Sequence, residues 1–343
     1  MNEQQTSRQL SFLDKAFPAL ILLCMAAGLA LGKVAPGVGH ALEPLIPFGL
    51  FLMIYPTVTK VPFRSLQRSA LEGRPAIFSI AFNYLVNPSL LFAFGWLFLR
   101  NYPDLWTGLI LLGLAPCIGM VLVWTDLGGA DNSLSLSLMA WNSLIQIVSA
   151  PVWIYLLIGT RISLPTGLIL ESTCLYLGLP LIAAYFTQRT VMRTKGEIWF
   201  KELLTPVLGK IQLTALLATL VVMFALKGEA IFHAPELIGY MIVPLALFFL
   251  TLFFVDTLSA CFEMRLSMDK SVTVGFHVTE RNFELSIALA LTAFAASPLV
   301  AVSTVIGPLI EVPVMLSLAW IGRRLVERFP LCCVPARARA YAP

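Results

Sequence analysis

The 343-residue sequence contains few charged residues and few histidines. Only 12% of its residues are Asp, Glu, Lys or Arg, and it has three histidines, whereas 58% of its residues are hydrophobic. A soluble protein of this composition would have too little polar surface to cover itself. The formal net charge of +4 is small and does not indicate a nucleic-acid partner. These scarcities favour a protein embedded in a lipid bilayer.

Several motifs that carry catalytic or nucleotide chemistry are also absent. The sequence has no GxxxxGK[ST] phosphate loop, so it contains no recognisable ATP-hydrolysing site. It also has no HExxH, CxxC or GxSxG pattern. We therefore expect neither an enzyme nor a bound cofactor or metal. The remaining enzymatic alternative is an intramembrane enzyme that uses Glu280, Glu284 and His277, and turnover of a substrate without any gradient would identify it.

The hydrophobic residues form long runs with few or no charges. Residues 16–31, 44–58, 76–99 and 105–125 each approach the roughly 20 residues that cross a hydrocarbon core about 30 Å thick. They lack a strict two-residue alternation, so they are typical of helices and not of barrel strands. We predict an all-α membrane protein with ten spans, at residues 16–34, 44–60, 76–99, 105–126, 133–158, 166–187, 208–226, 236–260, 271–296 and 298–321.

Lysine and arginine are distributed asymmetrically over the predicted loops. If the N-terminus is placed in the cytoplasm, 18 of the 23 Lys and Arg residues lie inside, four lie outside, and Arg281 falls within a span. Positively charged loops face the cytoplasm in membrane proteins. The sequence therefore predicts a multi-pass protein of the cell inner membrane with both termini in the cytoplasm.

Ten spans divide into two halves of five. An odd number of spans per half means that the second half enters the membrane from the opposite side, which is the plan of an inverted repeat. The polar interruptions near Cys117 and Asn282 occupy matching places in the two halves. We predict a first five-helix repeat at 1–160, a second at 161–325, and a basic cytoplasmic tail at 326–343.

The predicted span 271–296 carries an unusual cluster of polar and charged residues. A charge at the bilayer centre costs about 2.5–3.5 kcal/mol on insertion scales, so these side chains must pair, titrate or line a watery cavity. A continuous helix would place Glu280 and Glu284 on one face by their i, i+4 spacing. The alternative is a re-entrant or extramembrane loop. The ionisable and amide residues of the span are His277, Glu280, Arg281, Asn282 and Glu284.

The predicted span 105–126 contains a candidate helix break. Pro116 removes a backbone donor, and Gly113 and Gly119 flank it, so we predict a discontinuous helix, with a simple proline kink as the alternative. Cys117 lies beside the break, where its sulfur is either a ligand for a soft metalloid or an apolar filler. Glu311, in the last span, is either a helix-packing group or a proton-relay carboxylate.

Several segments together resemble a known family. They include GLFLMIYPTVTKV at 49–61, GLAPCIGMVLVWTDL at 113–127, NFELSIALAL at 282–291 and VIGPLIEVPV at 305–314. The chain resembles, over nearly its whole length, the Acr-type arsenite efflux permeases of the bile acid:sodium symporter superfamily. The resemblance implies two inverted five-helix repeats whose broken helices 4 and 9 cross at mid-membrane.

The resemblance also implies an activity, which is export of arsenite, and sometimes antimonite, in exchange for protons. The implied partners are a metalloid oxyacid, protons and the lipid bilayer, and the implied mechanism is alternating access of one helix bundle against another. The family's functional cysteine and glutamate correspond to Cys117 and Glu284. We expect substrate binding by Cys117, Glu280, Arg281 and Asn282, and proton coupling by Glu284 and Glu311.

Two departures from the family pattern stand out. The family usually has Arg directly before the cysteine, where this chain has Pro116, and it usually has small or amide residues where this chain has Glu280 and Arg281. If the two helices cross, Arg281 occupies the space of the missing arginine. The position of the superfamily's sodium-site carboxylate holds His277, which disfavours sodium coupling. The second hypothesis is a sodium-coupled organic anion symporter with Arg281 as the counter-charge of the anion.

Overall fold

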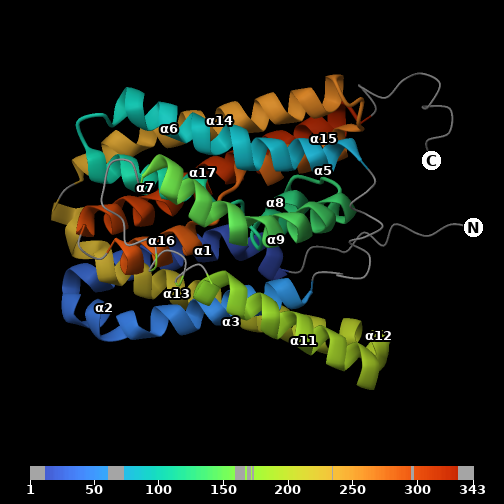
Figure 1. Cartoon of the computed structure of the whole chain (residues 1–343), viewed down its shortest axis with the longest axis horizontal. Coiled ribbons are helices and arrows are strands. Elements are labelled where there is room, and N and C mark those ends of the chain that lie inside the picture. Colours follow the sequence, from blue (N-terminus) through green and yellow to red (C-terminus); the bar gives the residue numbers. More distant parts are fainter. Residues whose placement is uncertain are drawn as a thin grey trace, which may run out of the picture.

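The protein is built of helices that are packed side by side along one direction (Figure 1). A computed structural model of the chain describes residues 12–60, 73–158, 167, 171, 174–233, 235–294 and 297–330. Over that part of the chain no strand forms, and the one strand-like pairing is an isolated bridge. The predicted all-α class is therefore confirmed.

The helices identify the chain as a multi-pass membrane protein. Five of the described helices are long and apolar enough to cross a membrane. They number six if the two parts of α9 (Asn132–Leu157), which are bent by 56° relative to each other, count as one span. The predicted count of ten spans stays a prediction. The predicted repeat boundary at 160/161 and most of the predicted tail lie outside the described residues.

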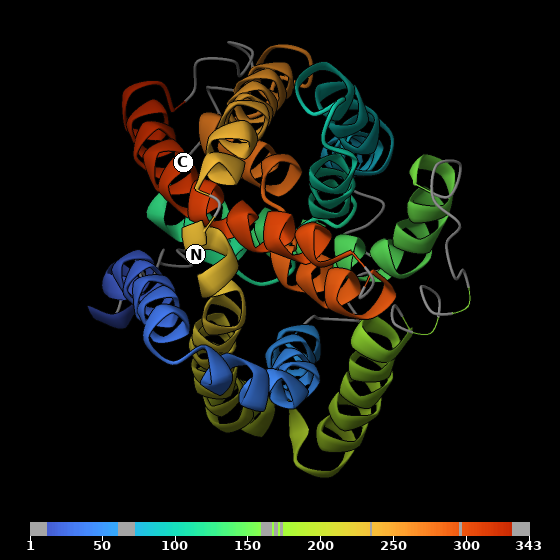
Figure 2. The ribbon, with the colours of Figure 1, turned by 90° about the vertical axis from the view of Figure 1, so that its left-hand side faces the viewer.

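One group of helices, which we call the small bundle, forms the lower layer of Figure 1. Within it, α1 packs against α13, α13 against α3, and α3 against α11. Figure 2 shows the same group below the remaining helices. Its members are α1 (Phe12–Val34), α2 (Pro36–Leu42), α3 (Ile46–Thr59), α11 (Leu179–Thr194), α12 (Gly196–Trp199) and α13 (Thr205–His233).

The remaining helices form the large bundle. In it, α14 packs against α15 and α17, and α17 packs against α7 and α16. Both bundles take helices from both halves of the sequence, so neither corresponds to a single predicted repeat. The members of the large bundle are α5 (Arg74–Ala81), α6 (Asn87–Phe98), α7 (Pro103–Gly113), α8 (Val121–Leu127), α9, α14 (Glu236–Phe262), α15 (Met268–Thr279), α16 (Phe283–Ala293) and α17 (Pro298–Arg328).

Two predicted spans differ at their ends from the helices of the structure. The span predicted at 44–60 is preceded by α2 and a 3-10 turn at Glu43–Leu45, and α3 begins only at Ile46. The last span, predicted to end at 321, continues as helix to Arg328 and takes in the first residues of the predicted tail. Helix ends of this kind are the least reliable part of a sequence-based assignment.

A turn of π-helix joins α5 to α6. Pro88 lies at the start of α6 and has no backbone N–H, and the preceding residues Phe82–Val86 adopt the wider π-helical hydrogen bonding. Such π turns often occur at functional sites. Here the turn directs the amides of Asn83 and Asn87 towards the end of α15, as described below.

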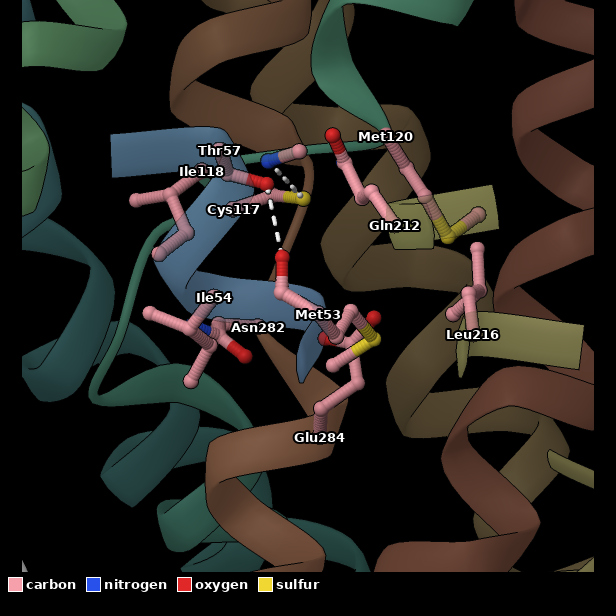
Figure 3. A pocket seen from close by; sticks show the side chains of 11 residues that line it. Met53, Ile54, Thr57, Cys117, Ile118, Met120, Gln212, Leu216, Asn282 and Glu284 are labelled. Carbon is pink, nitrogen blue, oxygen red and sulfur yellow. Dashed lines mark hydrogen bonds between the residues drawn. The ribbon is translucent and has the colours of Figure 1, made fainter. Parts of the chain in front are cut away.

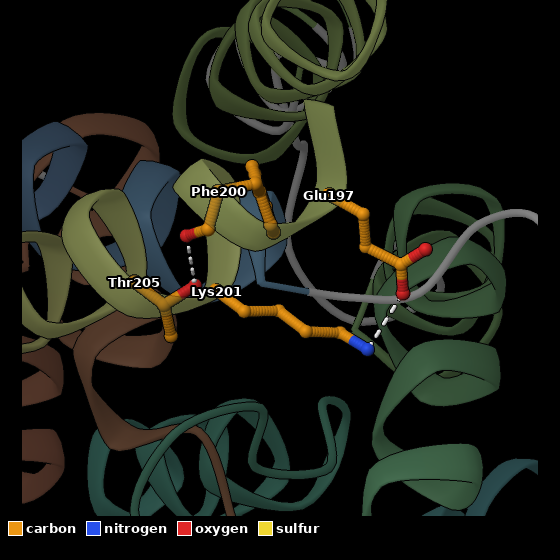
Figure 4. Close-up of polar contacts among 4 residues, drawn as sticks. All are labelled: Glu197, Phe200, Lys201 and Thr205. Atoms are coloured by element: carbon orange, nitrogen blue, oxygen red, sulfur yellow. Dashed lines mark hydrogen bonds and ion pairs between the residues drawn. The ribbon is translucent and has the colours of Figure 1, made fainter. Parts of the chain in front are cut away.

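A second π turn leads from α12 into α13 (Figure 4). Gly196 has a φ of 84°, which a glycine adopts without strain, and it separates α11 from α12. Lys201 Nζ then pairs with Glu197 Oε1 at 2.6 Å, and Thr205 Oγ1 donates to the Phe200 carbonyl at 3.0 Å. The ion pair is exposed and adds little stability. The turn places α11 and α13 on either side of α3.

Candidate functional site

Two broken helices meet inside the large bundle. Helix α7 ends at Gly113 and α8 begins at Val121, while α15 ends at Thr279 and α16 begins at Phe283. The extended residues between the two pairs of half-helices form an antiparallel bridge. The backbone N–H of Cys117 donates to the Glu280 carbonyl at 3.2 Å. The N–H of Asn282 donates to the Ala115 carbonyl at 2.8 Å. The two predicted helix interruptions are thus present and pair with each other.

Pro116 lies opposite Arg281 in this bridge. The bonds of the bridge come from the residues on either side of the pair, so the missing N–H of Pro116 removes none of them. The two departures from the family pattern therefore face each other. The helix face that Glu280 and Glu284 would share in a continuous helix does not form, because Glu280 has extended backbone angles and the helix begins only at Phe283.

A pocket lies where the crossing faces the small bundle (Figure 3). It contains about 310 Å³ of free space including its opening. The crossing contributes sulfur, amide and carboxyl groups, and α3 and α13 contribute a hydroxyl, an amide and apolar side chains. The lining residues are Met53, Ile54, Thr57, Cys117, Ile118, Gly119, Met120, Gln212, Leu216, Asn282 and Glu284.

The start of α16 presents polar groups to this pocket. The Asn282 side-chain oxygen caps the helix by accepting from the backbone N–H of Leu285 at 3.0 Å. Its side-chain nitrogen is buried and has no hydrogen-bond partner within the described part of the chain. Glu284 follows in the first turn of α16 and is 6% exposed. The pocket is therefore lined by an asparagine whose amide nitrogen is buried without a partner among the described residues, and by a nearly buried carboxyl group.

Cys117 belongs to the same pocket. It is 4% exposed, and its Sγ accepts from the backbone N–H of Gly119 at 3.5 Å (Figure 3). Any larger residue at Gly119 would bring its Cβ to 3.1 Å from the Gln212 amide nitrogen. That amide is positioned in turn by Lys60, whose Nζ donates to the Gln212 Oε1 at 2.6 Å. The absence of a side chain at Gly119, two residues after the cysteine, thus leaves room for the Gln212 side chain that α13 places over the pocket.

The structure divides the residues that the sequence predicts as substrate-binding. Cys117 and Asn282 line the pocket, whereas Glu280 and Arg281 are buried and are not among its lining residues. Glu311, one of the two predicted proton-coupling residues, is also absent from the lining, and its Oε1 accepts from the backbone N–H of Arg281 at 2.9 Å. Extended residues alternate in direction, so the broken segment directs neighbouring side chains to opposite sides.

Glu280 is held by a tryptophan from α8. The indole nitrogen of Trp124, which is fully buried, donates to Glu280 Oε1 at 2.8 Å. The second carboxyl oxygen has no hydrogen-bond partner in the described residues. The contact of Trp124 with Glu280 depends on the crossing, which brings α8 next to the end of α15. The bond fixes the carboxyl group next to the broken segment.

We expect Trp124→Phe to lower the stability of the protein by about 1–3 kcal/mol, because it leaves a buried carboxyl oxygen without its donor. The measurement is the thermal unfolding of the purified protein in detergent. Trp96→Phe is the matched control, since Trp96 is 53% exposed on α6. Equal unfolding temperatures for the two variants would contradict the role given to the indole bond.

The end of α15 is held by polar side chains of other helices. Asn83 Nδ2 donates to the His277 carbonyl at 3.0 Å, and Asn87 Nδ2 donates to the Val278 carbonyl at 2.8 Å. The His277 ring nitrogen Nε2 lies 2.7 Å from Ser135 Oγ. The two asparagine contacts satisfy carbonyl groups that a helix end leaves without partners. The break in α15 is therefore a fixed part of the fold.

Sequence reasoning missed three residues of the region. Asp256 on α14 is fully buried, and neither of its carboxyl oxygens has a hydrogen-bond partner among the described residues. The sequence does mark Asp256, because it is a lone charged residue in the apolar run LFFVDTL. Thr57 and Gln212 line the pocket from the small bundle, and nothing in their local sequence points to it.

Comparisons with known proteins found a matching family model and several similar proteins. The family model described as the sodium bile acid symporter family matches residues 47–234. An arsenical-resistance protein Acr3 of Corynebacterium glutamicum is 34% identical, over 97% of this chain and 95% of its own length. An Acr3 protein of Alkaliphilus metalliredigens is 27% identical, over 96% of this chain and 97% of its own. An uncharacterized transporter of Synechocystis sp. is 32% identical, over 94% of this chain and 91% of its own.

Proposed function

The chain belongs to the sodium bile acid symporter family, and from this premise we propose that it exports arsenite, or a related trivalent metalloid, in exchange for protons. It acts as a secondary transporter and not as an enzyme. The related proteins named for arsenical resistance support arsenite as the substrate. The observation that carries the proposal is the pocket at the helix crossing, with Cys117, Asn282 and Glu284 in its lining.

These three residues suit the chemistry of arsenous acid. The acid is neutral near pH 7, so it needs no counter-charge, and its three hydroxyl groups need hydrogen-bond partners. A thiol is a soft ligand for the arsenic atom. The Asn282 amide nitrogen, which lacks another partner among the described residues, can donate to a hydroxyl oxygen. Glu284 accepts from a hydroxyl when ionised and carries the exchanged proton when protonated.

The two bundles provide a mechanism for transport. The pocket is lined by the crossing in the large bundle and by α3 and α13 in the small bundle. A relative movement of the bundles would open the pocket to one side of the membrane and then to the other, as in other transporters with discontinuous helices. Binding of arsenite and protonation of Glu284 exclude each other in the same pocket, so the two cargoes move in opposite directions.

We propose the membrane arrangement that goes with this mechanism. Ten spans form two inverted five-helix repeats, the crossing lies at mid-membrane, and both termini are in the cytoplasm of a cell whose inner membrane holds the protein. One broken helix in each half of the chain, α7–α8 and α15–α16, supports the repeat. Antimonite, whose trivalent hydroxide has the same shape and softness, is a further substrate of the same pocket.

The alternative is a sodium-coupled organic anion symporter, and it needs a cation facing the substrate. The described lining of the pocket contains no Lys, Arg or His side chain. Arg281, the expected counter-charge, donates instead to oxygen atoms of the protein. A neutral hydroxylated substrate therefore suits this pocket better than an organic anion does.

Transport in everted membrane vesicles tests the proposal. We expect an acid-inside pH gradient to drive arsenite and antimonite into the vesicles, because export from the cell corresponds to uptake here. A protonophore should abolish the uptake, and a sodium gradient alone should not support it. Vesicles without the protein are the control. Uptake that persists without a pH gradient, or that follows a sodium gradient, would contradict proton exchange.

A further inference from the structure

Arg281 is a fully enclosed arginine that is bound by uncharged oxygen atoms. It is 1% exposed, its Nε donates to the Thr279 carbonyl at 3.1 Å, and its Nη1 donates to the Gly113 carbonyl at 3.5 Å. Its Nη2 donates to the Asn83 side-chain oxygen at 2.7 Å and also to the Val278 carbonyl. In the described part of the chain no carboxylate lies within ion-pair distance of the guanidinium.

The carbonyl groups around Arg281 come from the ends of two half-helices. Gly113 is the last residue of α7, and Val278 and Thr279 are the last residues of α15. Each helix C-terminus has the effect of about half a negative charge. Two such ends sum to about one negative charge, which one guanidinium group balances. The Phe248 ring lies 5.8 Å from the guanidinium carbon and closes the site on the side of α14.

The arrangement is therefore a cation site whose cation is part of the chain. Carbonyl groups at the ends of broken helices are the groups that coordinate dissociable cations in transporters. The guanidinium of Arg281 fills such a position here, on the side of the crossing that does not line the pocket. Helix α16 begins after the break, and its N-terminus lies at the pocket.

We propose that Arg281 is a tethered cation that neutralises the C-terminal ends of α7 and α15 and so holds the crossing together without a dissociable metal ion. It is a positioning residue, since it acts on the pocket through the crossing. Removing its side chain would leave an enclosed cavity lined by carbonyl oxygens, and a small free cation would then bind there. The inference rests on the proposed function only where it is tested by transport, because the cation-binding experiment does not require arsenite uptake.

The first experiment measures cation binding by the purified Arg281→Ala variant in detergent. Millimolar guanidinium chloride or methylguanidinium should raise its unfolding temperature in a saturable way, by about 3 °C or more. The wild-type protein and Arg324→Ala should not respond, because in both the Arg281 site is filled. Tetramethylammonium chloride controls for ionic strength, since that cation is too large and has no N–H donor. A folded Arg281→Ala variant that responds to none of the small cations would overturn the proposal.

The second experiment measures transport in everted vesicles. We expect Arg281→Ala to lower arsenite uptake about tenfold, guanidinium to restore part of it, and Arg281→Lys to retain more uptake than Arg281→Ala. Restoration by sodium in place of guanidinium would equally support a cation site. Wild-type activity in Arg281→Ala without any added cation would refute it.

The wild-type protein supplies a test that does not depend on the folding of a variant. Its uptake of arsenite should be the same when sodium and potassium are both replaced by N-methylglucamine, because its cation is built in. A requirement for an inorganic cation would overturn the tethered-cation proposal and leave arsenite transport intact. Failure of the proposed function would be visible separately, as absence of arsenite uptake by the wild type together with a normal guanidinium response of Arg281→Ala.

Discussion

Glu284→Gln is expected to lower proton-driven arsenite uptake into everted vesicles by on the order of 100-fold, the scale on which a positioned proton-transfer group contributes. Glutamine has the shape of glutamate and can still bind a hydroxyl group, but it cannot release a proton. The variant should therefore still exchange arsenite for arsenite across the membrane in the absence of a pH gradient. It should also fail to raise the luminal pH when arsenite is added. The measurements are radiolabelled arsenite uptake and a pH-sensitive dye in the same vesicles.

The matched control for this prediction is Glu311→Gln. Glu311 accepts a hydrogen bond from the Arg281 backbone N–H, and the amide oxygen of glutamine can accept the same bond. We therefore expect the Glu311 variant to retain most of its proton-driven uptake. If Glu311→Gln abolished proton movement while Glu284→Gln did not, the roles of the two residues would be exchanged, and the carboxyl group in the pocket would not be the proton carrier.

The helical fold could be predicted from the sequence because its signals are local. Long apolar runs fix the class, and Pro116 with its flanking glycines predicts an interruption of one helix. The interruption between Thr279 and Phe283 carries no proline, so its polar residues mark the region of the break without showing at which residue the helix ends. That break is stabilised from outside the segment, by the pairing with Ala115 and Cys117 and by side chains of the α5–α6 turn.

The candidate site could be predicted only in part, for a similar reason. Cys117, Asn282 and Glu284 lie beside breaks that the sequence marks, and they line the pocket. The direction of the Arg281 side chain depends on carbonyl groups that come together only when α7 and α15 meet. The sequence therefore could not predict that the guanidinium group donates to these carbonyl groups. Gln212 is placed at the pocket by the packing of α13 on α3, for which no local pattern exists.

Cys117→Ala is expected to weaken arsenite transport by up to about 100-fold, the scale on which disturbed coordination of a metal weakens its binding. Arsenous acid can condense with a thiol: an As–S bond forms, an As–OH bond breaks, and the hydroxyl leaves as water with the thiol proton. The methyl group of alanine offers no ligand. Cys117→Ser offers a harder oxygen ligand and should weaken transport nearly as much. The measurement is the concentration dependence of initial arsenite uptake in everted vesicles.

Cys24→Ser is the matched control, because Cys24 is a half-buried free cysteine of α1 that does not line the pocket. It should leave uptake unchanged. A second readout separates binding from folding: arsenite should slow the alkylation of Cys117 in the wild-type protein, as measured on its peptide by mass spectrometry. Wild-type uptake by Cys117→Ala would show that the hydroxyl groups of the substrate, held by Asn282 and Glu284, are sufficient for recognition. The pocket would then select its substrate by hydrogen bonding and not by the softness of sulfur, and arsenite and antimonite would no longer be its favoured class over other small neutral hydroxides.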